Sequence, residues 1–195
     1  MILCNREIQA ALDTGRLVIE PQPTPRQANL GQYCPFDTHS VELTLAPEIS
    51  IPQKGPYTYD LVANGLAQFI GRDSQKVILD TNQPFPLAPG QFVLAMTREV
   101  VVLPIPAEGQ TCLAARIEGK SSRARCGVLV HFTAPTVHPG WNGPLTLEMI
   151  NLGPVPFLLR PGMPIAQLIV EEVKGLPFAN PSQFHGQQTP EGTAP

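Results

Sequence analysis

Residues 119–127 bring together side chains that suit the binding of phosphate groups. The segment reads GKSSRARCG and carries two serines, one lysine and two arginines between glycines. Arginine and lysine donate charge-assisted hydrogen bonds to phosphate oxygens, and serine hydroxyls add neutral donors. The same composition is ordinary for a charged surface turn, and it does not match the nucleotide-binding loop GxxxxGK[ST]. The pattern alone favours neither interpretation.

Residues 145–151 place one carboxylate in an apolar run. The segment reads LTLEMIN, so Leu147 and Met149 flank Glu148. A well-positioned carboxylate can take a proton from water and later return it, which contributes about 100- to 10,000-fold in rate. A glutamate on the solvated face of a sheet gives the same pattern. The residues alone leave both interpretations open.

The histidines and cysteines form no metal-binding pattern. The zinc-dependent nucleobase deaminases carry H-x-E and P-C-x-x-C motifs, and this sequence has neither. The histidines include no H-x-H pair and no pair four residues apart. Four separated cysteines without C-x-x-C predict reduced and mostly buried thiols. We therefore expect no zinc in the protein. These residues are His39, His131, His138 and His185, and Cys4, Cys34, Cys112 and Cys126.

The elements that must position these segments are mostly strands. A short helix is expected from Asn5 as N-cap to Gly15, with Ile8, Ala11 and Leu12 on one face. Period-two alternation then predicts a half-buried strand with Val41, Leu43 and Leu45 on the buried face. Short strands separated by Pro-Gly and Asn-Gly turns predict a mainly β protein, a distorted antiparallel barrel or jelly roll. The further expected strands are 91–97, 100–103, 127–133, 145–151, 157–159 and 165–170.

Length and charge restrict the class of protein. With 195 residues and a net charge of −3, the chain suits one domain and lacks the basic field that a nucleic-acid polymer requires. There is no apolar run long enough for a membrane span and no export signal, so we expect a soluble, cytoplasmic protein. Residues 1–176 should form the domain. Residues 177–195, rich in Pro, Gln and Gly, should form a flexible tail.

The two chemical segments resemble those of the dCTP deaminases, a family that shares its fold with the trimeric dUTPases. The family pattern G-[RK]-S-S-x-A-R is matched by residues 119–125, and its T-L-E strand by residues 146–148. Residues 3–8, 85–103 and 184–188 resemble further family segments. The resemblance implies a dUTPase-like fold, a homotrimer and the zinc-independent conversion of dCTP to dUTP and ammonia. It also implies that Mg²⁺ arrives on the nucleotide triphosphate.

The resemblance also implies roles for individual residues. Glu148 would activate the water, Ser121 would lie near that water, and Arg125 would stabilise the reacting end of the ring. His131 is more often a hydrogen-bonded core residue than a catalyst. The expected substrate-binding residues are Lys120, Ser122 and Arg123 for the phosphates, Ala134 for the base, His138 for the sugar, and Phe184 and Gln188 in a closing tail.

Three positions depart from the family pattern. His138 stands where the deaminases usually carry an Asp that contacts the sugar hydroxyl, and where dUTPases carry their water-activating Asp. Phe184 replaces the tail Tyr, Gln183 precedes it where Lys is common, and Arg123 replaces an apolar residue. His138 therefore disfavours dUTP hydrolysis, alone or after deamination. A non-catalytic nucleotide-binding regulator is the remaining alternative.

Overall fold

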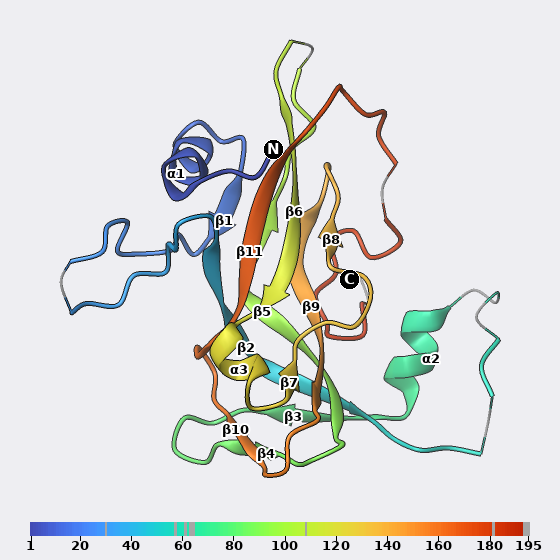
Figure 1. The fold of residues 1–195 in the computed structure, drawn as a ribbon. Helices are drawn as coiled ribbons and strands as arrows, with labels where there is room; N and C mark the ends of the chain where they lie inside the picture. The colour runs from blue at the N-terminus through green and yellow to red at the C-terminus, as the bar shows by residue number, and fades with distance from the viewer. Residues whose placement is uncertain are drawn as a thin grey trace.

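Antiparallel strands dominate the computed structural model, which describes residues 1–29, 31–56, 58–60, 62, 65–107, 109–180 and 182–192 (Figure 1). The helices formed by these residues are α1 (Asn5–Asp13), α2 (Leu66–Arg72) and α3 (Ser121–Ala124). The strands are β1 (Val18–Glu20), β2 (Val41–Pro52), β3 (Ser74–Ile78), β4 (Phe85–Leu87), β5 (Phe92–Val102), β6 (Cys112–Gly119), β7 (Val128–Leu129), β8 (Thr136–Val137), β9 (Asn142–Asn151), β10 (Phe157–Leu159) and β11 (Pro164–Val173).

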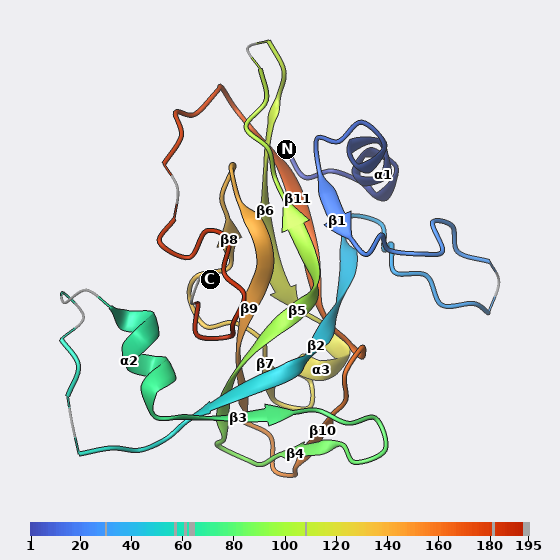
Figure 2. The ribbon, with the colours of Figure 1, turned by 180° about the vertical axis from the view of Figure 1, so that it is seen from behind.

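One curled sheet carries most of the strands. Its order is β7-β9-β5-β2-β11-β6-β8, with β1 paired to β5 and β3 paired to β2, while β10 and β4 form a separate pair. Every pairing is antiparallel. The sheet wraps round so that β9 and β6 lie near each other in both views (Figures 1 and 2). The mainly β, antiparallel fold expected from the sequence is confirmed.

The core follows from the alternation of apolar residues. Val41, Leu43 and Leu45 of β2 are fully buried while Glu42 and Thr44 between them are half-buried, as the pattern predicts. In β9, Leu147 and its alternate neighbours are buried in the same way. Burying a side chain of this size contributes about 1.5–3 kcal/mol, so these two strands fix which of their faces points outward.

Helix α1 covers one edge of the sheet. Ile8, Ala11 and Leu12 form its buried face, as predicted. The N-cap is Cys4 rather than Asn5, because the helix already includes residue 5, and no side chain caps it. Gly15 follows the helix with φ +72°, a left-handed conformation that glycine adopts without strain.

Several sequence-based expectations need correction. The strands expected at 91–97 and 100–103 form one strand, β5, with an irregular register between Met96 and Val100. The strand expected at 127–133 ends at Leu129, where the chain turns towards β8. The thiols are free but not mostly buried, since Cys112 alone of the four is buried, while Cys4 and Cys126 are exposed.

Candidate active site

Glu148 lies on the outward face of β9, where the alternation places it. Its neighbours Leu147 and Met149 are fully buried, and Glu148 itself is half-buried. The backbone N–H of Phe132 donates a hydrogen bond of 3.1 Å to Glu148 Oε2. The carboxylate is therefore held in place but remains accessible to a ligand.

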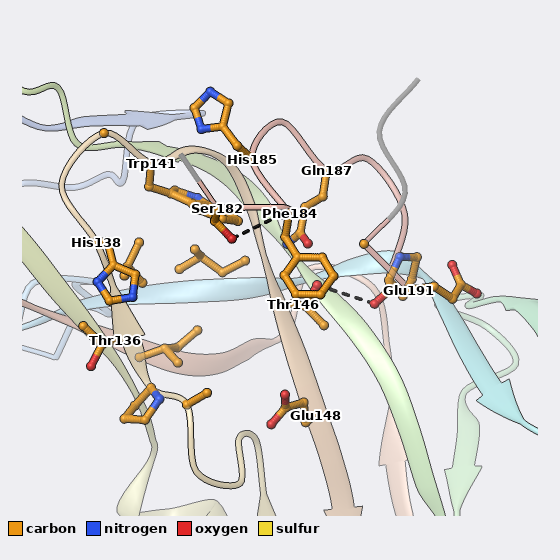
Figure 3. A pocket seen from close by; sticks show the side chains of 18 of the residues that line it. Thr136, His138, Trp141, Thr146, Glu148, Ser182, Phe184, His185, Gln187 and Glu191 are labelled. Atoms are coloured by element: carbon orange, nitrogen blue, oxygen red, sulfur yellow. Dashed lines mark hydrogen bonds between the residues drawn. The ribbon is translucent and has the colours of Figure 1, made fainter. Parts of the chain in front are cut away.

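A cleft of about 550 Å³ opens above Glu148 (Figure 3). Its floor is formed by β9, one wall by the segment that joins β8 to β9, another by α2, and its cover by the C-terminal segment. Figure 3 shows His138 and Trp141 on one side and Phe184 and Glu191 on the other. Further lining residues from these elements are Leu66, Ile70, Leu145, Thr146, Ser182, His185 and Gln187, and Ala134 lines the cleft from the segment between β7 and β8.

The C-terminal segment, residues 182–192, packs onto β9. The N–H of Gly186 donates to the Asn142 carbonyl at 3.0 Å, and Gln187 Nε2 donates to the Pro144 carbonyl at 2.9 Å. Gln187 and Glu191 are buried, at 4% and 5% exposure. The segment therefore covers the cleft, and its mobility stays a prediction.

Glu191 fixes the end of this segment to the sheet. The fully buried Ser50 hydroxyl of β2 donates a hydrogen bond to its carboxylate. Burial by itself pushes the pKa of Glu191 upward, but hydrogen bonds from Ser50 and Thr189, together with the charge of Lys76, outweigh it. The pKa is held below its usual range. Glu191 is therefore an anionic anchor for the cover of the cleft.

A second cavity of about 530 Å³ meets Glu148 from another side. Three aromatic residues line it, Phe69 of α2, Phe92 of β5 and Phe132, and the last two rings pack edge to face with centroids 5.7 Å apart. Glu148 and Leu94 line both cavities. The carboxylate thus separates two spaces large enough for a ligand ring and for water.

The phosphate-binding candidates lie elsewhere in the same chain. Ser121, Ser122 and Arg125 are exposed on or just after α3, which lies apart from α2 and the C-terminal segment in both views (Figures 1 and 2). None of the described residues 120–126 lines either cavity. The structure therefore does not bring Ser121 and Arg125 to Glu148 within one subunit.

Two cations of this segment already have internal partners. Lys120 forms an ion pair with Glu42 of β2. Burial, with the nearby charge of Arg123, holds the pKa of Lys120 below its usual value. The Arg123 guanidinium lies over the Phe157 ring, 5.6 Å from its centroid. Arg125 is the cation that this segment exposes most freely.

Two glycines lock this segment to the end of β9. Gly127 has φ +88°, and a Cβ on it would lie 2.3 Å from the backbone nitrogen of Gly153. The turn after α3 and the turn after β9 are therefore in backbone contact. A side chain at either position would force them apart.

The cleft lacks the charges that a triphosphate needs. No lysine or arginine occurs among its described lining residues, whereas Glu148 and Glu191 are both present. Polyphosphate binding normally relies on Lys, Arg or a metal ion. A triphosphate at this cleft would therefore need cations from a second copy of the chain or from a bound metal.

Sequence reasoning found part of the cleft. Glu148, Ala134, His138 and Phe184 line it together. Gln188 is exposed, and the preceding amide, Gln187, faces the cleft instead. The reasoning missed several lining residues. Thr146 could have been found, because it lies two residues before Glu148 on the same strand face. The missed residues include Trp141, Thr146, Gln187 and Glu191.

The described residues carry no group of three or more His, Cys, Asp or Glu side chains arranged to hold a metal ion. The absence of zinc stays a prediction. Within the same described ranges, each helix is too short or too polar to span a membrane.

Comparisons with known proteins agree with the fold. A model of the dCTP deaminase-like family matches residues 2–173. The 2'-deoxycytidine 5'-triphosphate deaminase from Agrobacterium tumefaciens matches with a TM-score of 0.60 and 18% identity, over 87% of this chain and 47% of that chain. This chain therefore spans about half the length of the Agrobacterium protein.

Two dUTPases give weaker structural matches. The EIAV dUTPase has a TM-score of 0.44 and 15% identity, over 86% of this chain and 97% of that chain. A point mutant of the dUTPase from phage phi11 of S. aureus, whose structure shows the coordination of a structural Mg(II) ion, has a TM-score of 0.36 and 11% identity, over 70% of this chain and 96% of that chain.

Proposed function

The chain belongs to the dCTP deaminase-like family, and on this premise we propose that it converts dCTP and water to dUTP and ammonia without zinc. The observation that carries the proposal is Glu148, a half-buried carboxylate at the floor of the cleft, held by the Phe132 amide. A fixed carboxylate next to a space for a ring and a space for water suits a proton shuttle.

The reaction needs one group to move protons in both directions. Glu148 takes a proton from water as the water oxygen bonds to C4 of the cytosine ring, and it passes this proton to N3, which receives the electron pair of the C4–N3 double bond. It then takes the proton of the new C4 hydroxyl and delivers it to the amino nitrogen as the bond between C4 and that nitrogen breaks, which leaves a C4 carbonyl, a protonated N3 and ammonia. Ser121 would orient the water, and Arg125 would stabilise the charge that develops on the ring. The Ala134 segment would contact the base.

We propose that each site forms between two copies in a homotrimer. Glu148 and the cleft would come from one copy, and Ser121 and Arg125 would come from α3 of its neighbour. The absence of Lys and Arg among the described lining residues supports this arrangement, as does the exposure of Ser121 and Arg125. A closed ring of copies with such head-to-tail contacts completes every site.

The triphosphate would bind to Ser122, Arg123 and Lys120 of the neighbouring copy and would carry Mg²⁺ with it. Lys120 would exchange Glu42 for a phosphate, and the lowered pKa of Lys120 marks a cation that is partly removed from water. Phe184 and the amides at Gln187 and Gln188 would close over the nucleotide.

His138 would take the place of the usual sugar-binding Asp. It is exposed at the wall of the cleft, and an imidazole can pair with a 3'-hydroxyl. It cannot serve as the Asp on which dUTP hydrolysis depends, so we propose deamination as the reaction. Neither a nucleic-acid polymer nor a membrane is a proposed partner, and the proposed location is the cytoplasm.

The test is to incubate the protein with dCTP and Mg²⁺ and to separate dCTP, dUTP and dUMP. We expect dUTP and ammonia in equal amounts. Glu148→Gln should lose at least about 100-fold in rate while nucleotide binding persists. Glu20→Gln on β1, outside the cleft, is the matched control. Production of dUMP would point to hydrolysis of dUTP, and binding without turnover would point to a regulator.

A further inference from the structure

A backbone amide in the loop between β7 and β8 holds Glu148. The loop leaves β7 at Leu129 and reaches β8 at Thr136, and the Phe132 N–H in its middle donates to Glu148 Oε2 at 3.1 Å. No other hydrogen bond to this carboxylate occurs among the described residues. The position of the loop therefore sets the direction of the carboxylate.

Two contacts attach this loop to β6. The Ile117 N–H donates to the Pro135 carbonyl at 2.8 Å near the β8 end. Nearer the middle, His131 Nε2 lies 3.5 Å from Glu118 Oε2. Because His131 directly precedes Phe132, this pair acts on the same peptide segment that presents the amide to Glu148.

Glu118 is itself held by charges on the sheet. Arg116 Nη1 lies 3.9 Å from Glu118 Oε1, and Arg116 Nε donates to Glu171 at 2.7 Å. The side chains of His131 and Glu118 are 21% and 34% exposed, so solvent competes only in part for their contact. The chain Glu171, Arg116, Glu118, His131 thus runs from β11 across β6 to the loop.

The surroundings of the imidazole indicate how it pairs. Nδ1 of His131 is buried and has no hydrogen-bond partner among the described residues. A neutral imidazole has one N–H and one bare nitrogen. With the proton on Nε2, the ring donates a hydrogen bond to Glu118. Nδ1 is then an acceptor without a donor, which costs less than a buried N–H without an acceptor. Among the described residues, Glu118 is therefore the hydrogen-bond partner that orients the ring.

We infer that His131 is a positioning residue for deamination at Glu148, acting through Glu118 on one side and the Phe132 amide on the other. This inference rests on the proposed function. His131 lines neither cavity, so it does not contact the nucleotide within its own subunit. Without the His131 side chain, the Phe132 peptide should shift and move the Glu148 carboxylate with it. A displacement of about 1 Å at a catalytic group can lower the rate about 100-fold.

The experiment compares His131→Ala with His131→Gln. Alanine removes the donor to Glu118, and we expect kcat to fall about 10- to 100-fold while KM for dCTP stays within about threefold. Glutamine carries an N–H donor at similar reach and should restore kcat to within about threefold of the parent. His39→Ala, at an exposed histidine outside both cavities, is the control and should behave like the parent.

A readout that does not depend on turnover is hydrogen exchange at the Phe132 amide. Exchange there should be at least about tenfold faster in His131→Ala than in the parent, and it should be restored in His131→Gln. Should His131→Ala fail to fold, Glu118→Ala removes the same contact from its more exposed side and should give the same two changes. If both alanine variants fold, the double variant should have no lower kcat than the weaker of the two single variants.

Three results would overturn the inference. They are a parental kcat in both alanine variants, a rise in KM with kcat unchanged, and unchanged exchange at the Phe132 amide. A parent protein that binds dCTP without turning it over would defeat the proposed function instead. Exchange at Phe132 would then still decide whether His131 positions this peptide.

Discussion

Mixing two inactive variants should restore activity if each site is shared between neighbouring copies. Arg125→Ala removes the exposed cation that follows α3, and Glu148→Gln removes the proton shuttle in the cleft. Each variant alone should lose about 100-fold or more, because every site then lacks one of the two groups. The two lesions lie on different elements, and neither is needed for the core.

The fraction of activity that mixing restores follows from the number of sites that receive both intact residues. When equal amounts of the two subunits assemble at random, the copy that supplies the arginine is intact half of the time, and so is the copy that supplies the glutamate. About one quarter of all sites should then be complete, and in a trimer that contains both kinds of subunit, which purification through both tags selects, one of the three sites should be complete. If both residues came from the same chain, no complete site would form.

The assay is co-expression of the two variants with different tags, purification through both tags, and measurement of dUTP formation. Mixing Ser121→Ala with Arg125→Ala is the matched control. Both substitutions lie on one short segment, so every copy supplies a segment that lacks one of the two side chains, and no complete site can form. An inactive Arg125/Glu148 mixture, an equally active Ser121/Arg125 mixture, or a monomer by light scattering at micromolar concentration would each refute the shared site.

Three further predictions concern the C-terminal cover of the cleft and the backbone contact between the turns after α3 and after β9. The pKa of Glu191 is held below its ordinary value of about 4.5, so its bond to Ser50 stabilises the packed tail above that pH and weakens as pH falls below it. The protection of the amides in residues 186–192 against hydrogen exchange, relative to their intrinsic exchange rates at each pH, should therefore fall on acidification, and Glu191→Gln should flatten that dependence. Truncation after Lys174 removes the cover and should raise KM for dCTP about tenfold or more in steady-state assays, whereas an unchanged KM would exclude a lid. Gly127→Ala should lower the free energy of unfolding by at least about 3 kcal/mol in denaturant titrations, since strain and a backbone clash add. Gly15→Ala, at φ +72° in open space, should cost only about 1–2 kcal/mol.

The sequence predicted the elements whose own residues carry the pattern. Strand β2 alternates with period two from Val41 to Leu45, and β9 does so around Glu148, so burial of one face was enough to identify them. Strand β6 was missed because Ala114, Ala115 and Arg116 favour helix. Its conformation is decided by pairing with β11, whose paired residues lie 47 to 61 positions further along the chain. Helix α2 was missed because it has no side-chain cap and buries no residue.

The site was predictable as chemistry but not as geometry. Residue types identified Glu148 and the serine and arginine segment, since few other side chains can perform these roles. The Ser50–Glu191 contact joins residues 141 positions apart, and neither residue stands out locally. The link from His131 to Glu118 likewise depends on how the β7–β8 loop crosses β6. Such long-range pairs depend on tertiary packing, which single-sequence periodicity does not encode.

Trp141 gives the cleft an optical probe of its own. It is the one tryptophan in the sequence, it lines the cleft half-buried, and its indole N–H donates to the Gly143 carbonyl at 2.9 Å. Trp141 and the backbone of Gln187 both lie against Gly143, so the ring is next to the C-terminal cover. A nucleotide that enters the cleft, or a cover that leaves it, must change the polarity around the indole and shift its fluorescence. Binding to variants without turnover, such as Glu148→Gln, can therefore be titrated directly and without a label.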